Sequence, residues 1–130
     1  MREILFRGKA RGNDTLEDGK WVIGSAIVDP ENSSYCIGSM MRTWSVDADT
    51  VGQYTGLTDE TDAMIFEGDI LGVRYGNEIQ YCAVEYDERT AQFVFDYGRR
   101  GVSKVEDLMS GVVFTVIGNT YDNPELLKKY

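Results

Sequence analysis

Between residues 64 and 97 the chain alternates short apolar and aromatic runs with tight turns, which leaves little room for long helices. Gly76-Asn77 is typical of a two-residue hairpin loop, and turns are also indicated at Glu67-Gly68-Asp69 and over 87–90. The chain holds 14 Gly but 2 Pro, with 8 Tyr, 5 Phe and 2 Trp, a composition that favours many short strands. We therefore predict a mainly β fold with minor α.

The C-terminal half is expected to form a small SH3-like barrel, with four or five meandering strands between residues 58 and 121 around one apolar set. Irregular alternation over 78–86 predicts a bulge in that strand. The segment 91–97 alternates more regularly and predicts an inner face of Ala91, Phe93, Phe95 and Tyr97 and an outer face of Gln92, Val94 and Asp96.

Two short helices are predicted in the same half. Ser103 and Glu106 have the spacing of a capping box, so Val102 to Met109 is expected to be helical. Asn123 is a favoured N-cap and Pro124 suits the first helical position, which predicts a short C-terminal helix.

The N-terminal half is expected to be an irregular β layer. Its predicted strands lie at 4–6, 21–28, 35–37 and 42–46, followed by an extended segment at 51–55. No linker composition separates the halves. We therefore predict a layer over 1–57 and a barrel with a helical turn over 58–130, packed as one intimate unit.

Four segments carry a resemblance to a known family: MREILFRGK at the start, GKWVIGS at 19–25, VGQYTGL running into MIFEGDIL at 51–71, and VIGNTYDNPELL at 116–127. In their order and spacing the chain resembles the YopX-like family of phage and prophage proteins. The resemblance covers nearly the whole chain and implies a phage or prophage accessory protein of the bacterial cytoplasm. One departure is Asp59-Glu60-Thr61-Asp62-Ala63, where members usually carry a hairpin rich in Lys, Asn and Gly.

Charge and residue inventory argue against several classes of function. The chain has 13 basic and 22 acidic residues, a net charge of −9, whereas a general nucleic-acid binder needs Lys and Arg against phosphates. It contains no His, and Cys36 and Cys82 are too few for a structural zinc site. No phosphate-binding glycine loop is found. We expect no catalytic activity and no cofactor.

Five residues are candidates for contacts or chemistry. Glu67 and Asp69 flank Gly68 and could hold Mg²⁺ through water, although Gly68 with a positive φ and Asp69 bonded to the turn amides explain the same motif structurally. Trp44, Gln53 and Tyr54 are candidates for an interaction surface. For Tyr54 and Trp44 the alternative is a place in the core.

Three functions are weighed. The leading hypothesis is a non-catalytic module that binds a host or phage protein. The second is a nucleic-acid-binding small barrel, or its inverse, an acidic mimic of DNA. The third is a Mg²⁺-dependent enzyme with a site of Glu67 and Asp69. The opening MREILFRGKA has no signal-peptide pattern and no run reaches the roughly 20 apolar residues of a membrane span, so a cytoplasmic protein is expected. Homo-oligomers through exposed strand edges stay open.

Overall fold

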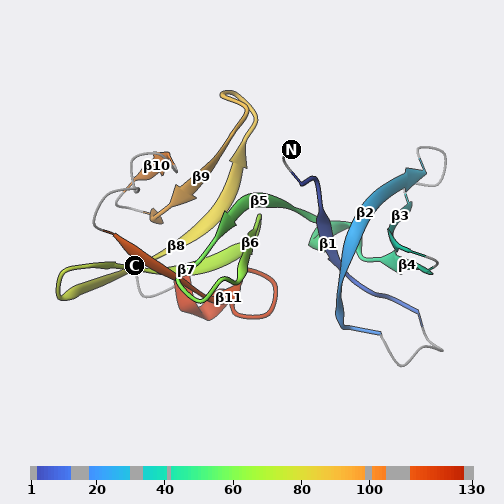
Figure 1. Ribbon diagram of the computed structural model, residues 1–130, viewed down its shortest axis with the longest axis horizontal. Coiled ribbons are helices and arrows are strands. Elements are labelled where there is room, and N and C mark those ends of the chain that lie inside the picture. The colour runs from blue at the N-terminus through green and yellow to red at the C-terminus, as the bar shows by residue number, and fades with distance from the viewer. Residues whose placement is uncertain are drawn as a thin grey trace. The chain divides into compact units, whose positions relative to one another are not determined.

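Antiparallel β-strands make up most of the structure, a computed structural model that describes residues 3–12, 18–29, 34–40, 42–98, 101–104 and 112–127. Two sheets have the strand orders β4-β3-β2-β1-β5-β6 and β10-β9-β8-β7-β11 (Figure 1). The prediction of a mainly β fold is confirmed. The chain divides into two compact units, residues 1–56 and 57–130, and β5 runs from the first into the second.

The first unit is a meander around a small apolar core. Its elements are β1 (Phe6–Lys9), β2 (Trp21–Asp29), β3 (Ser34–Ser39), β4 (Arg42–Val46), the 3-10 helix η1 (Ala48–Thr50) and the start of β5 (Gly52–Thr58). The sheet curls until Ala10, just after β1, bridges Val46 at the end of β4, where the Arg11 amide donates to the Ser45 carbonyl at 2.8 Å. Ala10, Val22, Ile37 and Val46 are buried inside this curl.

A close approach of β2 to β3 requires glycine at position 24. A Cβ built on Gly24 would lie 2.1 Å from the Gly38 carbonyl oxygen, far inside van der Waals contact with backbone that cannot move aside. Gly24 and Gly38 both lie in strands, but a Cβ on Gly38 would meet nothing nearer than 3.6 Å. The curl of the first sheet therefore depends on the first of these glycines and not on the second.

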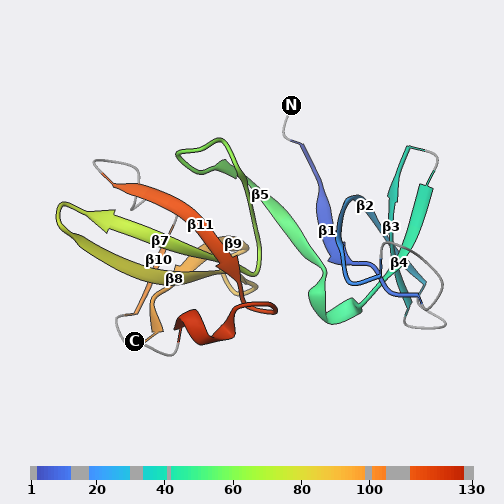
Figure 2. The ribbon, with the colours of Figure 1, turned by 90° about the horizontal axis from the view of Figure 1, so that it is seen from below.

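The second unit is a five-stranded antiparallel sheet with a short hairpin beside it. Its elements are the end of β5, β6 (Met64–Phe66), β7 (Asp69–Tyr75), β8 (Glu78–Asp87), β9 (Gln92–Asp96), β10 (Val102–Lys104), β11 (Val113–Asn119) and the 3-10 helix η4 (Pro124–Leu127). Figure 2 shows β11, β7 and β8 side by side, with η4 following β11. The hairpin turn predicted at Gly76-Asn77 joins β7 to β8. No helix in the described part of the chain is long and apolar enough to cross a membrane.

The predicted closing of this sheet into a barrel is wrong. β10 and β11 are opposite edges of an open sheet, and the described residues contain no closed barrel. The outer edge of β11 is already occupied: the Glu60 amide donates to the Phe114 carbonyl at 3.3 Å, and the Val116 amide donates to an Asp59 carboxylate oxygen at 2.9 Å. A turn, and not a closing strand, satisfies these backbone groups.

Three local predictions are corrected. Residues 102–104 of the predicted helix instead pair with β9, Val102 opposite Asp96, and positions 105–109 lie outside the described residues. The bulge expected in 78–86 lies on β11, where the register shifts between Val116 and Gly118. Val94, predicted to face out, is only 7% exposed. The C-terminal helix exists as η4, a 3-10 turn over 124–127.

The core of the second unit lies on one face of its sheet. Ile65, Leu71, Val73, Cys82, Val84, Phe95 and Tyr97 form one buried cluster, and Phe114 meets Phe95 edge to face with the ring centroids 6.1 Å apart. Residues 72, 74, 79, 81 and 115 alternate with these core residues and so lie on the opposite face. That face is the place to look for a site.

We predict that Gly24→Ala lowers the free energy of unfolding by about 3 kcal/mol or more, because the new methyl group overlaps backbone atoms. Gly38→Ala is the matched control and should cost less than about 1 kcal/mol, since its methyl group finds ordinary contacts. Urea unfolding followed by tryptophan fluorescence measures both. Equal losses for the two variants would contradict the close approach of β2 and β3.

Candidate functional site

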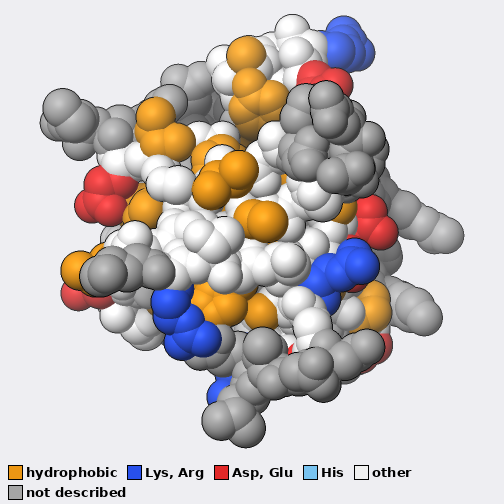
Figure 3. Space-filling model, turned by 90° about the vertical axis from the view of Figure 1, so that its right-hand side faces the viewer, with side chains coloured by type: hydrophobic (Ala, Val, Ile, Leu, Met, Phe, Trp, Pro, Cys, Tyr) orange, Lys and Arg blue, Asp and Glu red, His pale blue; other side chains and the backbone are white. Residues whose placement is uncertain are grey.

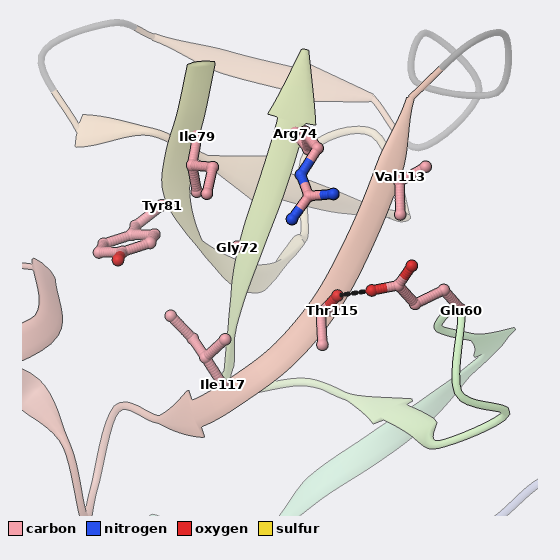
Figure 4. A pocket seen from close by; sticks show the side chains of 8 residues that line it. All are labelled: Glu60, Gly72, Arg74, Ile79, Tyr81, Val113, Thr115 and Ile117. Atoms are coloured by element: carbon pink, nitrogen blue, oxygen red, sulfur yellow. Dashed lines mark hydrogen bonds between the residues drawn. The ribbon is translucent and has the colours of Figure 1, made fainter. Parts of the chain in front are cut away.

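The outer face of β8, β7 and β11 carries a groove of about 250 Å³ (Figure 4). Its floor is Gly72 at the middle of β7, and Arg74 follows on the same strand. The walls come from both neighbouring strands and from the turn before β6: Ile79, Tyr81, Val113, Thr115, Ile117 and Glu60. All eight residues belong to the second unit.

The groove exists because the residue at the middle of this face, Gly72, has no side chain. Gly72 lies directly between Tyr81 on β8 and Thr115 on β11, so neighbouring side chains rise on both sides of a position that has none. A Cβ built on Gly72 would contact Ile117, Ile79 and Tyr81 at 3.6–3.8 Å, which is ordinary packing distance. The space could therefore hold a side chain of this protein, and instead it is left open.

The walls are apolar and exposed. Ile79 is 50% exposed, Val113 40% and Ile117 39%, which is high for aliphatic side chains gathered around one hollow. Thr115 and Ile117 are two residues apart on β11, so their side chains point to the same face and both line the groove. Apolar walls with a few polar groups are typical of binding sites.

A buried carboxylate fixes the rim of the groove. Asp59 is 6% exposed, and its Oδ1 accepts from the Thr61 amide at 2.8 Å, the Thr61 hydroxyl at 2.7 Å and the Ala63 amide at 3.0 Å. Its Oδ2 accepts from the Val116 amide at 2.9 Å. Burial alone would raise the pKa of Asp59, but the hydrogen bonds from Thr61, Val116 and Ala63 outweigh it and hold that pKa below its ordinary value of 3.8.

The turn that Asp59 holds places Glu60 beside Thr115. Glu60 Oε1 accepts from the Thr115 hydroxyl at 2.5 Å, while the Arg74 guanidinium extends over the floor between β8 and β11 (Figure 4). The polar groups of the groove are therefore one cation, one carboxylate and two hydroxyls. No group of three or more His, Cys, Asp or Glu side chains within the described ranges could hold a metal ion.

The predicted pair Glu67 and Asp69 lies in a tightly bonded turn. Asp69 is 1% exposed, and its Oδ2 accepts from the Phe66 amide at 2.7 Å. Gly68 has a φ of 93°, its amide donates to the Val84 carbonyl at 2.8 Å, and its carbonyl accepts from the Thr120 amide at 2.8 Å. This geometry matches the structural interpretation of the motif.

The other three predicted residues lie outside the groove. Trp44 on β4 is half-buried against the first core, with the Arg42 guanidinium 5.2 Å from its ring centroid. Gln53 and Tyr54 follow one another on β5, where Gln53 pairs with Phe6 and the Tyr54 amide donates to the Leu5 carbonyl. Elsewhere in the first unit, Figure 3 shows hydrophobic side chains over the middle of one face with basic side chains nearer its margins.

Sequence reasoning missed the residues that line the groove. The available signal was Gly72, a glycine inside the strand pattern of 70–75, since such a glycine often marks a place where something approaches the sheet closely. Its partners Tyr81 and Thr115 follow only from the register of β7 with β8 and β11.

A second hollow on this unit, of about 100 Å³, contains a pair of acids. It is lined by Glu85 and Asp96 with Tyr81, Ala83, Tyr97, Gly98 and Leu127. Glu85 is exposed as a residue, but partial burial of its carboxyl, and then the negative charge of Asp96, a hydrogen bond shared with it and the charge of Glu67, raise its pKa above the ordinary value of 4.5. Ionised Glu85 therefore costs stability.

These features define a class, a small antiparallel β protein of two units with an apolar groove on one sheet. The family model described as YopX protein matches residues 9–128, and the chain belongs to the YopX family. It is similar to protein EF1440 from Enterococcus faecalis (24% identity, TM-score 0.59, covering 98% of this chain and 100% of that one). It is also similar to protein yopX from Bacillus subtilis (16% identity, TM-score 0.57, covering 98% of each chain). No curated protein matches.

We predict that Asp59→Asn lowers the free energy of unfolding at pH 7 by about 1–3 kcal/mol, because an amide NH₂ would face backbone donors. With its lowered folded pKa, Asp59 contributes stability that is present above about pH 3.8 and lost as the pH falls through that lower value. The variant should therefore lose less stability than the wild type between pH 5 and pH 2. Asp62→Asn, at an exposed position with φ 66°, is the control. Urea unfolding curves across pH test this, and identical curves for the wild type and Asp59→Asn would refute it.

We predict that Glu85→Gln raises stability at pH 7, by up to about 1 kcal/mol. The folded pKa is raised, so the cost of ionised Glu85 is absent below pH 4.5 and develops as the pH rises through the raised value. The gain should thus be larger at pH 7 than at pH 4. Glu88→Gln, in the exposed turn after β8, serves as the comparison in thermal melts. A variant that gains nothing at pH 7 would count against the acid pair.

Proposed function

We propose that this protein is a non-catalytic accessory protein of a phage or prophage, which acts in the cytoplasm of the bacterial host by binding another protein through the groove on β7, β8 and β11. The observation that carries the proposal is the glycine floor between exposed aliphatic walls. Apolar surface left in water does not stabilise a monomer, whereas a binding protein can bury that surface against its partner.

The residue types of the groove support a protein partner. Tyr and Arg are frequent at the centres of protein interfaces, and Tyr81 and Arg74 supply them here. The volume of about 250 Å³ is smaller than most sites for a whole cofactor and suits one or two side chains of a partner.

The reactive groups of the chain favour binding over catalysis. The sequence contains no His, so no imidazole serves as a general base. Burial raises the pKa of the Cys82 thiol to about 12, which leaves it unreactive on the core side of the sheet. The alternatives of nucleic-acid binding and of a carboxylate Mg²⁺ enzyme stay predictions from the sequence.

We predict that Gly72→Val abolishes partner binding, because the valine side chain fills the floor of the groove. Valine is favoured in strands, and the Cβ that it adds lies at ordinary packing distance from Ile117, Ile79 and Tyr81, so the variant should fold. Thr90→Val adds the same kind of apolar surface in the exposed turn between β8 and β9 and is the matched control.

The measurement is affinity capture from phage-infected or lysogenic bacterial lysate, with bound proteins identified by mass spectrometry and thermal melts showing that all three proteins fold. The wild type and Thr90→Val should retain the same protein, and Gly72→Val should lose it. A partner that Gly72→Val still retains, or the absence of any specific partner, would overturn the proposal.

A further inference from the structure

The groove offers a partner one cation among aliphatic side chains. Arg74 is the only basic residue of the eight that line it, and its neighbours across the sheet are Ile79 on β8 and Val113 on β11. The stem of Arg74 therefore lies among apolar side chains, and its guanidinium is carried over the floor (Figure 4).

Glu60, the carboxylate that lines the groove, is hydrogen-bonded to Thr115 and not to Arg74. Glu60 accepts from Thr115, and the Asp59 hydrogen bonds fix the turn that holds it there. No ion pair between Glu60 and Arg74 occurs within the described part of the chain. The guanidinium thus keeps donors directed toward an incoming group, and guanidinium binds carboxylates through two parallel hydrogen bonds.

From this charge complementarity we infer that the groove binds a peptide segment in which a single carboxylate stands next to an aliphatic side chain, the carboxylate on Arg74 and the aliphatic group on the Gly72 floor. The inference rests on the proposed function and specifies the chemistry of its partner. Ile79 and Val113 beside Arg74 supply apolar contacts for the aliphatic side chain next to that carboxylate.

The net negative charge of the second unit further restricts which peptide segments can bind in the groove. Residues 57–130 contain 14 acidic and 7 basic side chains, so a strongly acidic segment is repelled before it reaches Arg74. The groove therefore selects an isolated carboxylate in an apolar context and rejects a run of acids.

The test is a titration of the ¹⁵N-labelled protein with blocked peptides, read in two-dimensional NMR spectra. The probes are acetyl-Leu-Glu-Leu-amide, its Gln counterpart and acetyl-Glu-Glu-Glu-amide, each to about 5 mM, the range suited to weak binding. The Leu-Glu-Leu peptide should shift the amide signals of Gly72 and Thr115 and the side-chain signal of Arg74. Its apparent affinity should exceed that of each other peptide by about fivefold or more.

Two variants show which residues cause the peptide binding and the preference for a carboxylate. Arg74→Gln should make the Glu and Gln peptides equal, and Gly72→Val should remove the binding of both. Arg89→Gln, an exposed arginine in the turn after β8, should leave the preference unchanged. Thermal melts establish that each variant is folded.

The failures of the inference and of the proposed function can be told apart. Equal binding of the Glu and Gln peptides, no shifts at all, or a preference that survives Arg74→Gln would overturn the carboxylate inference, whatever the lysate capture shows. If the peptide preference holds but Gly72→Val still captures the wild-type partner, the ligand chemistry stands and the proposed function fails.

Discussion

The second unit depends on a carboxylate that is almost entirely removed from water. Asp59 joins the turn after β5 to β11 across 57 residues of sequence, with both of its oxygens accepting hydrogen bonds. Burying a charge in this way is tolerable only because several donors compensate for the lost hydration. The bond to the Val116 amide also satisfies a backbone group on an edge strand that would otherwise invite pairing with another chain.

The groove results from the turn that Asp59 holds against β11 together with the glycine at position 72. The Asp59 turn ends the sheet at β11 and sets Glu60 against Thr115, and Gly72 leaves the middle of the face without a side chain. Neither feature alone makes a site. Without the turn, the outer edge of β11 at Phe114 and Val116 would lack its partners, and with a larger residue at position 72 the face would be filled.

Local chemistry made some elements predictable, and long-range pairing decided the others. The hairpin of β7 and β8 follows from Gly76-Asn77 and the flanking strand residues, all of which are neighbours in sequence. The helix predicted at Val102 fails because pairing with β9 competes successfully with a local capping signal. The prediction of a closed barrel is wrong because the turn at Asp59 bonds to the outer edge of β11. No sequence pattern indicates this long-range bond between Asp59 and Val116. The Glu67-Gly68-Asp69 turn was predictable in its backbone, whereas the groove could not be predicted, since Gly72 acquires its meaning only from residues 81 and 115.

The permissive surroundings of Gly72 bear on how such a protein can change over generations. A Cβ added at this position meets its nearest neighbours at 3.6–3.8 Å, whereas one added at Gly24 overlaps backbone, so the groove at Gly72 can be made shallower while the scaffold survives. Under the proposed function, a change at this one codon would alter the shape of the binding groove at little risk to the architecture.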